Sequence, residues 1–224
     1  MKITVLIPTY NEEKTIAGVL HAVFHADTLG NEIEVIVIDD GSTDRTQEAL
    51  KAIRQPLTLL RHERNLGKGK AIRTGLAAAT GDYILIQDAD FEYSPKEYPK
   101  LIAAVAGNNA VYGRRSYRQG YIRYRIGAYL LTLVTCILFR KKLHDIYTCY
   151  KLLPKKMMDK LSCSSDGFEI EAEVTGKLIR MKVPITEVPI VYHPRSFSQG
   201  KKIRAKDAWK GFLVLFRLWT GSMI

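Results

Sequence analysis

The chain has 224 residues, of which 46% are hydrophobic and 25% are charged, and its formal net charge is +11. This length fits one domain with its own core, and the composition is that of an ordinary globular protein. The three cysteines form no CxxC pair, which argues against a disulfide framework or a zinc site and suits a reducing compartment. The positive charge favours anionic partners, such as nucleic acid, acidic lipid head groups or phosphate-bearing substrates, although solubility alone is a simpler explanation.

The first half of the chain alternates between short apolar runs and amphipathic stretches. Strands are predicted at residues 3–7, 34–38, 57–60 and 83–86, and helices at residues 12–26, 43–54, 67–79 and 94–106. This alternation predicts an α/β fold with a doubly wound, mainly parallel sheet. Ligands of such sheets gather at the carboxyl ends of the strands.

The second half is less regular. Residues 114–125 mix arginines with tyrosines, and the apolar run 126–139 that follows is too short to span a bilayer. A second sheet-like stretch is predicted at 183–192. The tail from residue 206 predicts an amphipathic helix, and its shared apolar face consists of Trp209, Phe212, Leu213, Phe216 and Trp219. We therefore expect a domain at 1–205, with a membrane-facing segment at about 114–142, and a C-terminal helix at 206–224. No signal peptide is expected at the start.

Acidic residues follow two of the predicted strands. Asp39 and Asp40 end the second strand, and Asp88-Ala89-Asp90 ends the fourth. The carboxyl ends of parallel strands meet at one sheet edge, so we expect these carboxylates to share a crevice, at neighbouring strand ends. A hard divalent cation such as Mg²⁺ relieves the repulsion between them. The alternate spacing of Asp88, Asp90 and Glu92 predicts that they face one ion.

The glycine-rich piece at residues 65–70 has two interpretations. It is neither a Walker A sequence nor a dinucleotide-binding fingerprint, because the glycine spacing fails for both. It is either a flexible turn into a helix, or a loop whose backbone N–H groups and two lysines hold a phosphate or shape a nucleotide pocket.

Seven motifs together resemble family 2 glycosyltransferases, most of all the dolichol-phosphate mannose synthase branch of polyprenyl-phosphate glycosyltransferases. The resemblance covers roughly residues 2–203. The motifs are Pro8-Thr9-Tyr10-Asn11-Glu12, Asp39-Asp40-Gly41-Ser42, Asn65-x-Gly67-Lys68-Gly69, Asp88-Ala89-Asp90, Gly113-x-Arg115, Asp145-x-x-Thr148-x-Tyr150-Lys151 with Gly167-Phe168-Glu169, and Pro189-Ile190-x-Tyr192-x-x-Arg195. The resemblance implies the GT-A fold, a nucleotide-sugar donor (GDP-mannose or a UDP-sugar) and a lipid-phosphate acceptor.

The resemblance also implies roles for single residues. Those implied to line the nucleoside are Pro8, Tyr10, Glu12, Asp39 and Asp40. Asp88, next to Ala89, would contact the sugar nucleotide. Asp90, with Glu92, would hold Mg²⁺ or Mn²⁺, and the phosphates would meet Arg115, Arg195 and Lys201. Asp88, Asp90 and Arg115 are thus the implied catalytic residues. The sequence departs from the branch at Glu92, often Gln there, which makes the metal site more anionic. It also departs on the acceptor side at Cys149, which leaves the sugar and the lipid open.

Two acceptors remain open at this stage. A phosphate acceptor is already anionic and needs no strong base, whereas a hydroxyl acceptor, as in polysaccharide or glycan synthesis, needs a carboxylate such as Asp145 or Glu169. The resemblance to the family implies inversion in both cases. The basic and aromatic segments predict a peripheral enzyme on the anionic, cytoplasmic face of a membrane, with a membrane-protein partner as a further expectation. Nucleic acid is not an expected partner, because no recognised nucleic-acid motif is present.

Overall fold

The computed structural model describes residues 1–116, 122–195 and 205–221, without the side chains of 122–125 and 205. The strands are β1 (Lys2–Thr9), β2 (Glu32–Asp39), β3 (Thr58–Arg61), β4 (Tyr83–Ile86), β5 (Ala110–Arg115), β6 (Lys151–Pro154) and β7 (Ile185–Ile190). The helices are α1 (Ile16–Phe24), α2 (Thr46–Lys51), α3 (Lys68–Ala78), the 3₁₀ turn η1 (Pro95–Glu97), α4 (Tyr98–Ala103), α5 (Ile122–Phe139), α6 (Lys155–Leu161), α7 (Ile170–Arg180) and α8 (Ala205–Thr220).

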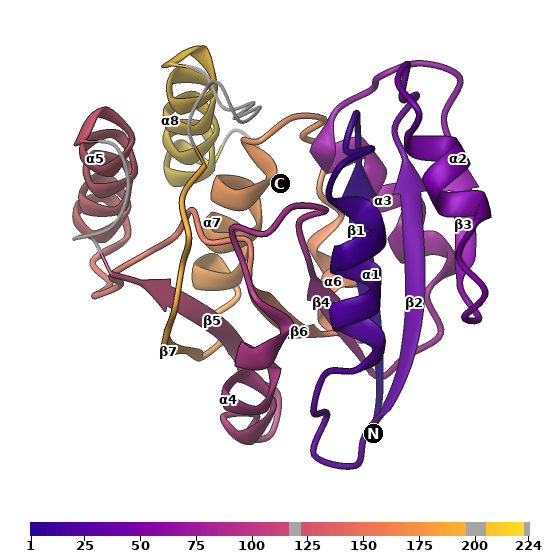
Figure 1. Cartoon of the computed structure of the whole chain (residues 1–224). Helices are drawn as coiled ribbons and strands as arrows, with labels where there is room; N and C mark the ends of the chain where they lie inside the picture. The colour runs from indigo at the N-terminus through magenta and orange to yellow at the C-terminus, as the bar shows by residue number, and fades with distance from the viewer. Residues whose placement is uncertain (117–121, 196–204, 222–224) are drawn as a thin grey trace.

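The strands form one sheet in the order β3-β2-β1-β4-β6-β5-β7 (Figure 1). All pairs are parallel except those of β6, which runs antiparallel to both β4 and β5. The predicted mainly parallel α/β sheet is therefore confirmed. One expectation was wrong: β1 lies between β2 and β4, so the two acidic strand ends are not neighbours.

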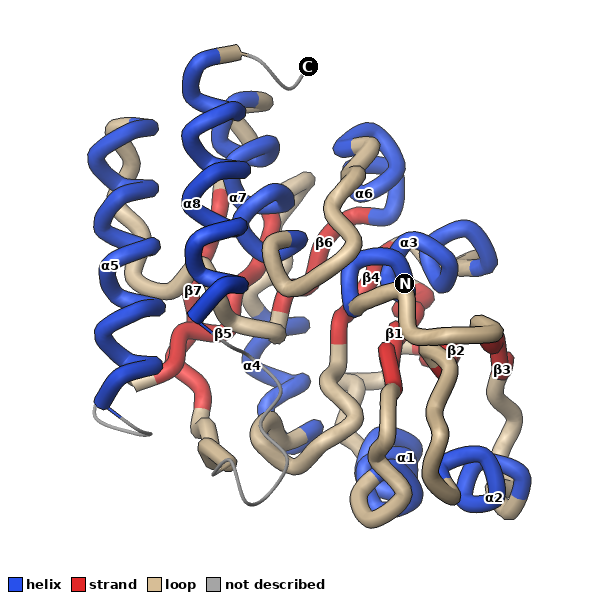
Figure 2. The backbone as a smooth tube through the Cα atoms, turned by 90° about the horizontal axis from the view of Figure 1, so that it is seen from above, coloured by secondary structure: helices blue, strands red, loops and turns tan. Residues whose placement is uncertain are grey.

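Helices cover both faces of this sheet. In Figure 2, α3 and α6 lie on one face, and α1, α2 and α4 lie on the other. The strands between these layers are uniformly apolar because both of their faces are buried, as in β2, where Val35, Ile36, Val37 and Ile38 all have 3% exposure or less. Gly75 lets α3 approach this layer, because a Cβ there would lie 2.7 Å from the Ile38 side chain.

The helices α5, α7 and α8 pack together beside the β5–β7 end of the sheet (Figures 1 and 2). A small second core joins them through Leu131, Ile146, Ala172 and Leu215. None of the helices in the described part of the chain combines the length and apolar character that a bilayer-spanning segment needs.

Several predicted boundaries moved for identifiable reasons. The helix predicted at 12–26 begins only at Ile16, because the carbonyl of Glu12 first closes a turn by accepting from the amides of Thr15 and Ile16. The helix predicted at 94–106 is divided into η1 and α4. Each piece has a proline in its first turn, a position where the missing N–H costs no hydrogen bond. The Ser94 side chain caps η1 by accepting from the Lys96 amide.

Candidate active site

The sheet changes direction of winding between β1 and β4, and charged side chains meet there. After β1 comes Glu12, and after β4 come Asp88 and Asp90. The crevice outside such a switch point is where open α/β sheets bind their ligands. Thr15 lies between the two sides, because its hydroxyl is within hydrogen-bond distance of both the carboxylate of Glu12 (2.7 Å) and the carbonyl of Ala89 (2.9 Å).

Arg195 joins the carboxylates of the two sides. Its guanidinium contacts Glu12 at 3.1 and 3.2 Å and also donates to Asp90 Oδ2. All three side chains are largely buried. Burial, reinforced by the charges of Asp88 and Glu92 and only partly offset by Arg195, raises the pKa of Asp90 to about 7. The structure thus brings three predicted site residues together, with an excess of negative charge at Asp90.

Glu92 faces the segment that follows β7. Its carboxylate accepts from the Tyr192 hydroxyl (2.9 Å) and from the Arg195 amide (2.6 Å), and its own amide donates to Asp90 Oδ1 (2.9 Å). Asp88 turns away from both toward Lys68. Across the described residues, no three His, Cys, Asp or Glu side chains are arranged to hold a metal ion. The expectation that Asp88, Asp90 and Glu92 face one ion is therefore not met by this arrangement, and metal binding by Asp90 and Glu92 stays a prediction.

Asp88 belongs to a line of alternating charges that leads from the partly exposed Asp88 into the interior. Its Oδ1 lies 2.7 Å from Lys68 Nζ, which also lies 3.0 Å from Glu171 Oε1. The other oxygen of Glu171 accepts from Lys151. Burial opposes the charged form of Asp88, but Lys68 outweighs it and brings the pKa of Asp88 below its usual value. Glu171 and Lys151 were not among the predicted site residues.

The acidic pair at the end of β2, Asp39 and Asp40, accepts hydrogen bonds from nearby backbone amides and side chains. Asp40 accepts from the amides of Leu66 (2.9 Å) and Gly67 (2.8 Å) and from His62 Nδ1 (2.7 Å). Asp39 accepts from the Ser42 amide and the Gln47 side chain. Their predicted contact with the nucleoside stays a prediction, while the structure gives both carboxylates protein partners.

The contacts of the glycine-rich piece at residues 65–70 favour one of its two interpretations, the turn into a helix. Gly67 has a φ of +101°, and a Cβ on Gly69 would lie 2.2 Å from the carbonyl oxygen of Ser165. The amide of Lys70 donates to the carbonyl of Asp166. The piece is therefore a packed turn that rests on residues 165–166, and the anion at its Leu66 and Gly67 amides is Asp40.

Arg115 has protein partners in this structure, and its expected contact with phosphate stays a prediction. It forms a two-bonded ion pair with Asp145 (2.7 and 2.8 Å) and lies over the Tyr192 ring at 5.1 Å. Asp145 is 1% exposed, so this pair is closed to solvent on the carboxylate side. Lys201, the third predicted phosphate ligand, lies outside the described residues, as do Arg118 and the side chains of Arg123 and Arg125 in the predicted membrane segment.

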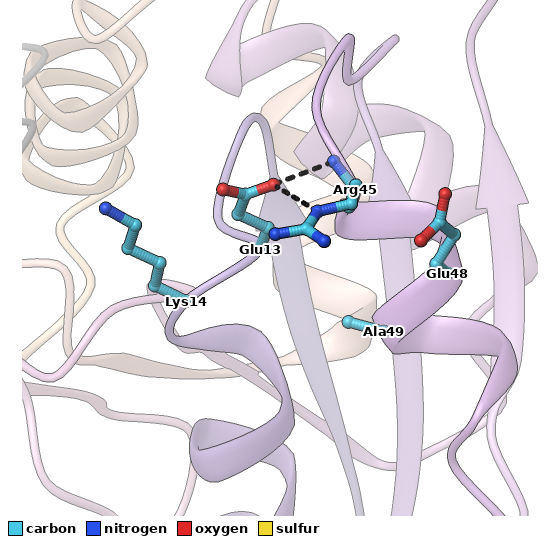
Figure 3. Close-up of a pocket in the computed structure, with 5 residues that line it drawn as sticks. All are labelled: Glu13, Lys14, Arg45, Glu48 and Ala49. Carbon is cyan, nitrogen blue, oxygen red and sulfur yellow. Dashed lines mark hydrogen bonds and ion pairs between the residues drawn. The ribbon is translucent and has the colours of Figure 1, made fainter.

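The remaining predicted residues lie at the end of β1, where Pro8 and Tyr10 are half-buried. A shallow hollow of about 290 Å³ lies nearby, lined by Glu13, Lys14, Arg45, Glu48 and Ala49 (Figure 3). Glu13 and Arg45 pair across it, as the dashed lines show. None of its residues belongs to the buried carboxylate groups, so we place the active site at the switch point and not in this hollow.

The fold and the site together define an α/β protein with acidic side chains on both sides of the switch point between β1 and β4. A family model for glycosyl transferase family 2 matches residues 4–161. The chain belongs to that family, and it is a glycosyltransferase.

Relatives and solved structures agree with this assignment. The chain is 28% identical to a dolichol-phosphate mannosyltransferase of Pyrococcus furiosus over all of its own length, but it spans only 66% of that relative. It is also 28% identical to an uncharacterized protein of Methanocaldococcus jannaschii, over 86% of this chain and 90% of that protein. Both the resemblance seen in the motifs and the enzyme class are thereby confirmed.

The fold is similar to that of glucosyl-3-phosphoglycerate synthase from Mycobacterium tuberculosis. A structure of that protein with Mn²⁺, uridine diphosphate and phosphoglyceric acid has a TM-score of 0.75 at 20% identity, covering 97% of this chain and 78% of that one. A second, with Mg²⁺ and uridine diphosphate, has a TM-score of 0.72 at 21% identity, covering 98% and 79%. These likenesses confirm the GT-A fold.

Sequence reasoning missed part of the site because of distance along the chain. One of the two interpretations of residues 65–70 gave Lys68 a phosphate-binding role, and neither predicted that it pairs with Asp88 and with Glu171, more than a hundred residues away. Lys151 did stand in a quoted motif. The sequence did offer one signal: a lysine begins a short strand that is otherwise apolar. Such a lysine indicates a buried positive charge, which needs a buried partner of opposite charge.

Proposed function

We propose that this glycosyltransferase moves a sugar from a nucleotide-diphosphate sugar, GDP-mannose or a UDP-sugar, to a polyprenyl phosphate at a membrane surface, with inversion. The proposed nucleotide-sugar donor rests on one observation: Arg195 contacts both Glu12 and Asp90 at the switch point of the sheet. The similarity to a dolichol-phosphate mannosyltransferase along the whole chain supports the acceptor half.

A divalent cation fits this site. Asp90 offers a hard carboxylate oxygen, and burial together with the neighbouring carboxylates of Asp88 and Glu92 raises its pKa to about 7, so a bound cation would favour its ionised form. Asp90 and Glu92 would hold Mg²⁺ or Mn²⁺, and the solved neighbour binds both ions with uridine diphosphate. When bound, such an ion stabilises the charge of a leaving diphosphate.

The chain's own residues would orient the donor and neutralise the leaving group. Arg195 lies at the carboxylates of Glu12 and Asp90, and its guanidinium geometry suits bidentate contact with phosphate oxygens. Asp88, held by Lys68, presents a fixed acceptor for a hydroxyl of the donor. The side chains of Glu12, Asp90 and Arg195 are largely buried, which strengthens their electrostatic contacts.

The acceptor determines whether the enzyme needs a base. Asp145 is unsuited to that task, because Arg115 engages both of its oxygens in a buried pair. Glu169 is the remaining candidate from the hydroxyl-acceptor reading: one of its oxygens is buried and has no hydrogen-bond partner among the described residues. A lipid phosphate, being already anionic, requires neither.

The variant Glu169→Gln distinguishes a lipid-phosphate acceptor from a hydroxyl acceptor. With a panel of labelled nucleotide sugars and a polyprenyl phosphate as acceptor, we expect label in the lipid extract and near-normal turnover by the variant. A loss of a hundredfold or more in the variant, roughly the contribution of a general base, together with transfer to a soluble sugar, would support the hydroxyl acceptor instead.

A membrane surface is the proposed location of the reaction, on its cytoplasmic side. The helices α5 and α8 lie side by side at one end of the molecule (Figures 1 and 2). Their exposed large apolar side chains are Ile126, Tyr129, Leu130, Leu133, Ile137, Trp209, Phe216 and Trp219. The opposite face of α8 packs inward through Val214, Leu215 and Leu218, so this helix is apolar on two sides.

Exposed cations border these apolar side chains, as anionic head groups require. They are Arg140, Lys141 and Lys142 after α5, and Lys206, Lys210 and Arg217 on α8. Binding to liposomes should therefore require acidic lipid and weaken with salt. Replacing Trp209 and Trp219 by Ser should reduce flotation with anionic liposomes while leaving the fold intact. Equal recovery with neutral and anionic liposomes would contradict the membrane proposal.

A further inference from the structure

A line of four charges leads from the acidic site, where Asp88 and Lys68 are partly exposed, to Glu171 and Lys151, which are buried in the protein interior. It runs from Asp88 through Lys68 and Glu171 to Lys151, with alternating sign at each step. We propose that Lys151 is a positioning residue for the donor sugar, acting through Glu171 and Lys68 on Asp88. This inference rests on the proposed function, since it requires Asp88 to contact the donor.

Lys151 itself is too deep to touch a substrate. Its side chain is fully buried, and its ammonium donates to the carbonyls of Ile146 (3.1 Å) and Thr148 (2.5 Å) and to Glu171. It also lies 4.8 Å from the centre of the Tyr112 ring. All three N–H donors are thus used, and two of them tie down the loop that precedes β6. A buried ammonium is costly unless it is paired, so a partner such as Glu171 is required.

Lys68 connects Asp88, at the site, with the buried end of the line. It stands between two carboxylates, Asp88 at 2.7 Å and Glu171 at 3.0 Å, and it is 10% exposed. The approach to Glu171 is within ion-pair distance but lacks hydrogen-bond geometry, because Glu171 Oε1 has no hydrogen-bond partner in the described structure. Since Lys151 already neutralises Glu171, Lys68 can direct its hydrogen bond to Asp88.

Removing the charge of Lys151 should redirect Lys68. Glu171 would then have Lys68 as its only nearby cation in the line, and the low dielectric of the interior makes that attraction strong. Lys68 would move toward Glu171, and Asp88 would lose the contact that fixes its orientation. A misplacement of this kind far from the reacting atoms costs roughly tenfold to a hundredfold in rate.

The chain offers a matched control on the same helix. Glu173 follows Glu171 by two residues on α7. It is also fully buried and pairs with Lys177 at 2.9 Å. Its carboxylate additionally accepts from the amides of Ser164 and Ser165. This second pair has no contact with Lys68 or Asp88 in the described structure, so Lys177→Met should affect stability alone.

The test compares Lys151→Met, Lys177→Met and the neutral pair Lys151→Met/Glu171→Gln in the full chain. With Mn²⁺ present, UDP and GDP report nucleotide binding, while UDP-glucose and GDP-mannose report donor use. We expect Lys151→Met to lower kcat/KM for the donor roughly tenfold to a hundredfold, with nucleotide affinity unchanged. The neutral pair should recover most of that loss, because Lys68 is again free to bond Asp88, and Lys177→Met should behave as the wild type.

Several results would overturn the proposal. They are unchanged donor kinetics in Lys151→Met, a parallel loss of nucleotide affinity, or a neutral pair no better than the single variant. If Lys151→Met does not fold, the neutral pair alone decides, since near-normal kcat/KM is expected of it. Crystal structures of the ligand-free variants add a readout independent of activity: the Lys68–Asp88 contact should break in Lys151→Met and persist in the neutral pair. A wild type that binds none of the four probes would refute the proposed donor, while these structures still report the coupling.

Discussion

Glu34 joins three parts of the sheet at the end opposite the active site. Its carboxylate accepts from the Thr4 hydroxyl of β1 (2.5 Å) and from the amide (2.9 Å) and hydroxyl (2.6 Å) of Thr80, just before β4. Lys2 lies 3.4 Å away. Burial alone would raise the pKa of Glu34, but the hydrogen bonds from Thr4 and Thr80 and the charge of Lys2 lower it to about 2, from an ordinary 4.5.

This lowered pKa sets a free energy and a pH range. Because the ionised form is favoured in the folded state, the stabilisation is fully present above about 4.5 and is lost as the pH falls through about 2. A pKa difference of one corresponds to about 1.4 kcal/mol, so the contribution near neutral pH is about 3 kcal/mol. Between pH 5 and pH 3 it should fall from about 3 to about 1.5 kcal/mol.

The perturbation is Glu34→Gln, measured by urea unfolding at pH 7, 5 and 3. The control is Glu32→Gln, on the same strand and near the same Lys2 (3.6 Å) but 70% exposed, for which a change within about 0.5 kcal/mol is expected. The deficit of Glu34→Gln should shrink as the pH falls, and glycosyl transfer by the folded variant should match the wild type. A deficit that stays constant from pH 7 to pH 3, or equal deficits for the two variants, would refute the reasoning.

Three further predictions concern the site. Arg195→Gln should tighten Mn²⁺ binding by the donor-free protein roughly tenfold, because the guanidinium no longer competes with the ion for Asp90. An EPR titration measures this affinity, and weaker binding by the variant would contradict the prediction. Gly69→Ala should destabilise the fold by about 1–3 kcal/mol in thermal unfolding, since its Cβ meets the Ser165 carbonyl, whereas Gly127→Ala in α5 meets nothing and should be neutral or stabilising. Asp145→Asn should cost about 3 kcal/mol or more of stability, because it leaves a buried Arg without its counter-charge; an equally stable but inactive variant would restore a direct role in transfer.

Sequence patterns sufficed where burial is uniform. The strands β1, β2 and β4 are apolar on both faces, so their positions could be predicted to within a few residues, and the acidic residues that follow β2 and β4 were correctly placed at strand ends. By contrast, β6 has four residues, begins with Lys151 and ends with a proline. Such a segment becomes a strand only because β4 and β5 flank it, which no local pattern can express.

The partners of the acidic residues were beyond sequence reasoning for a different reason. A carboxylate at a strand end can face a metal, a nucleoside or the protein's own amides, and the residue types are the same in all three cases. Asp40 bonds the Leu66 and Gly67 amides because the chain returns there after β3, and Asp88 bonds Lys68 because the first residue of α3 lies near the segment that follows β4. These pairings depend on loop geometry, whereas the resemblance to the family transfers only residue types and their order.

The place of β6 in the sheet has a consequence for how the protein is made. The strand that completes the edge of β4 is β6, which leaves the ribosome roughly 65 residues later. Until then the β4 edge offers unpaired backbone groups, which are templates for wrong pairing. The strands β1 to β4 can already pair with one another at that stage. We therefore expect them to form an early N-terminal subdomain whose β4 edge stays unpaired until β6 has been made. Slow synthesis between residues 86 and 151 would then lengthen the period in which nascent chains can aggregate, and chaperones that cover exposed strand edges would matter most in that interval.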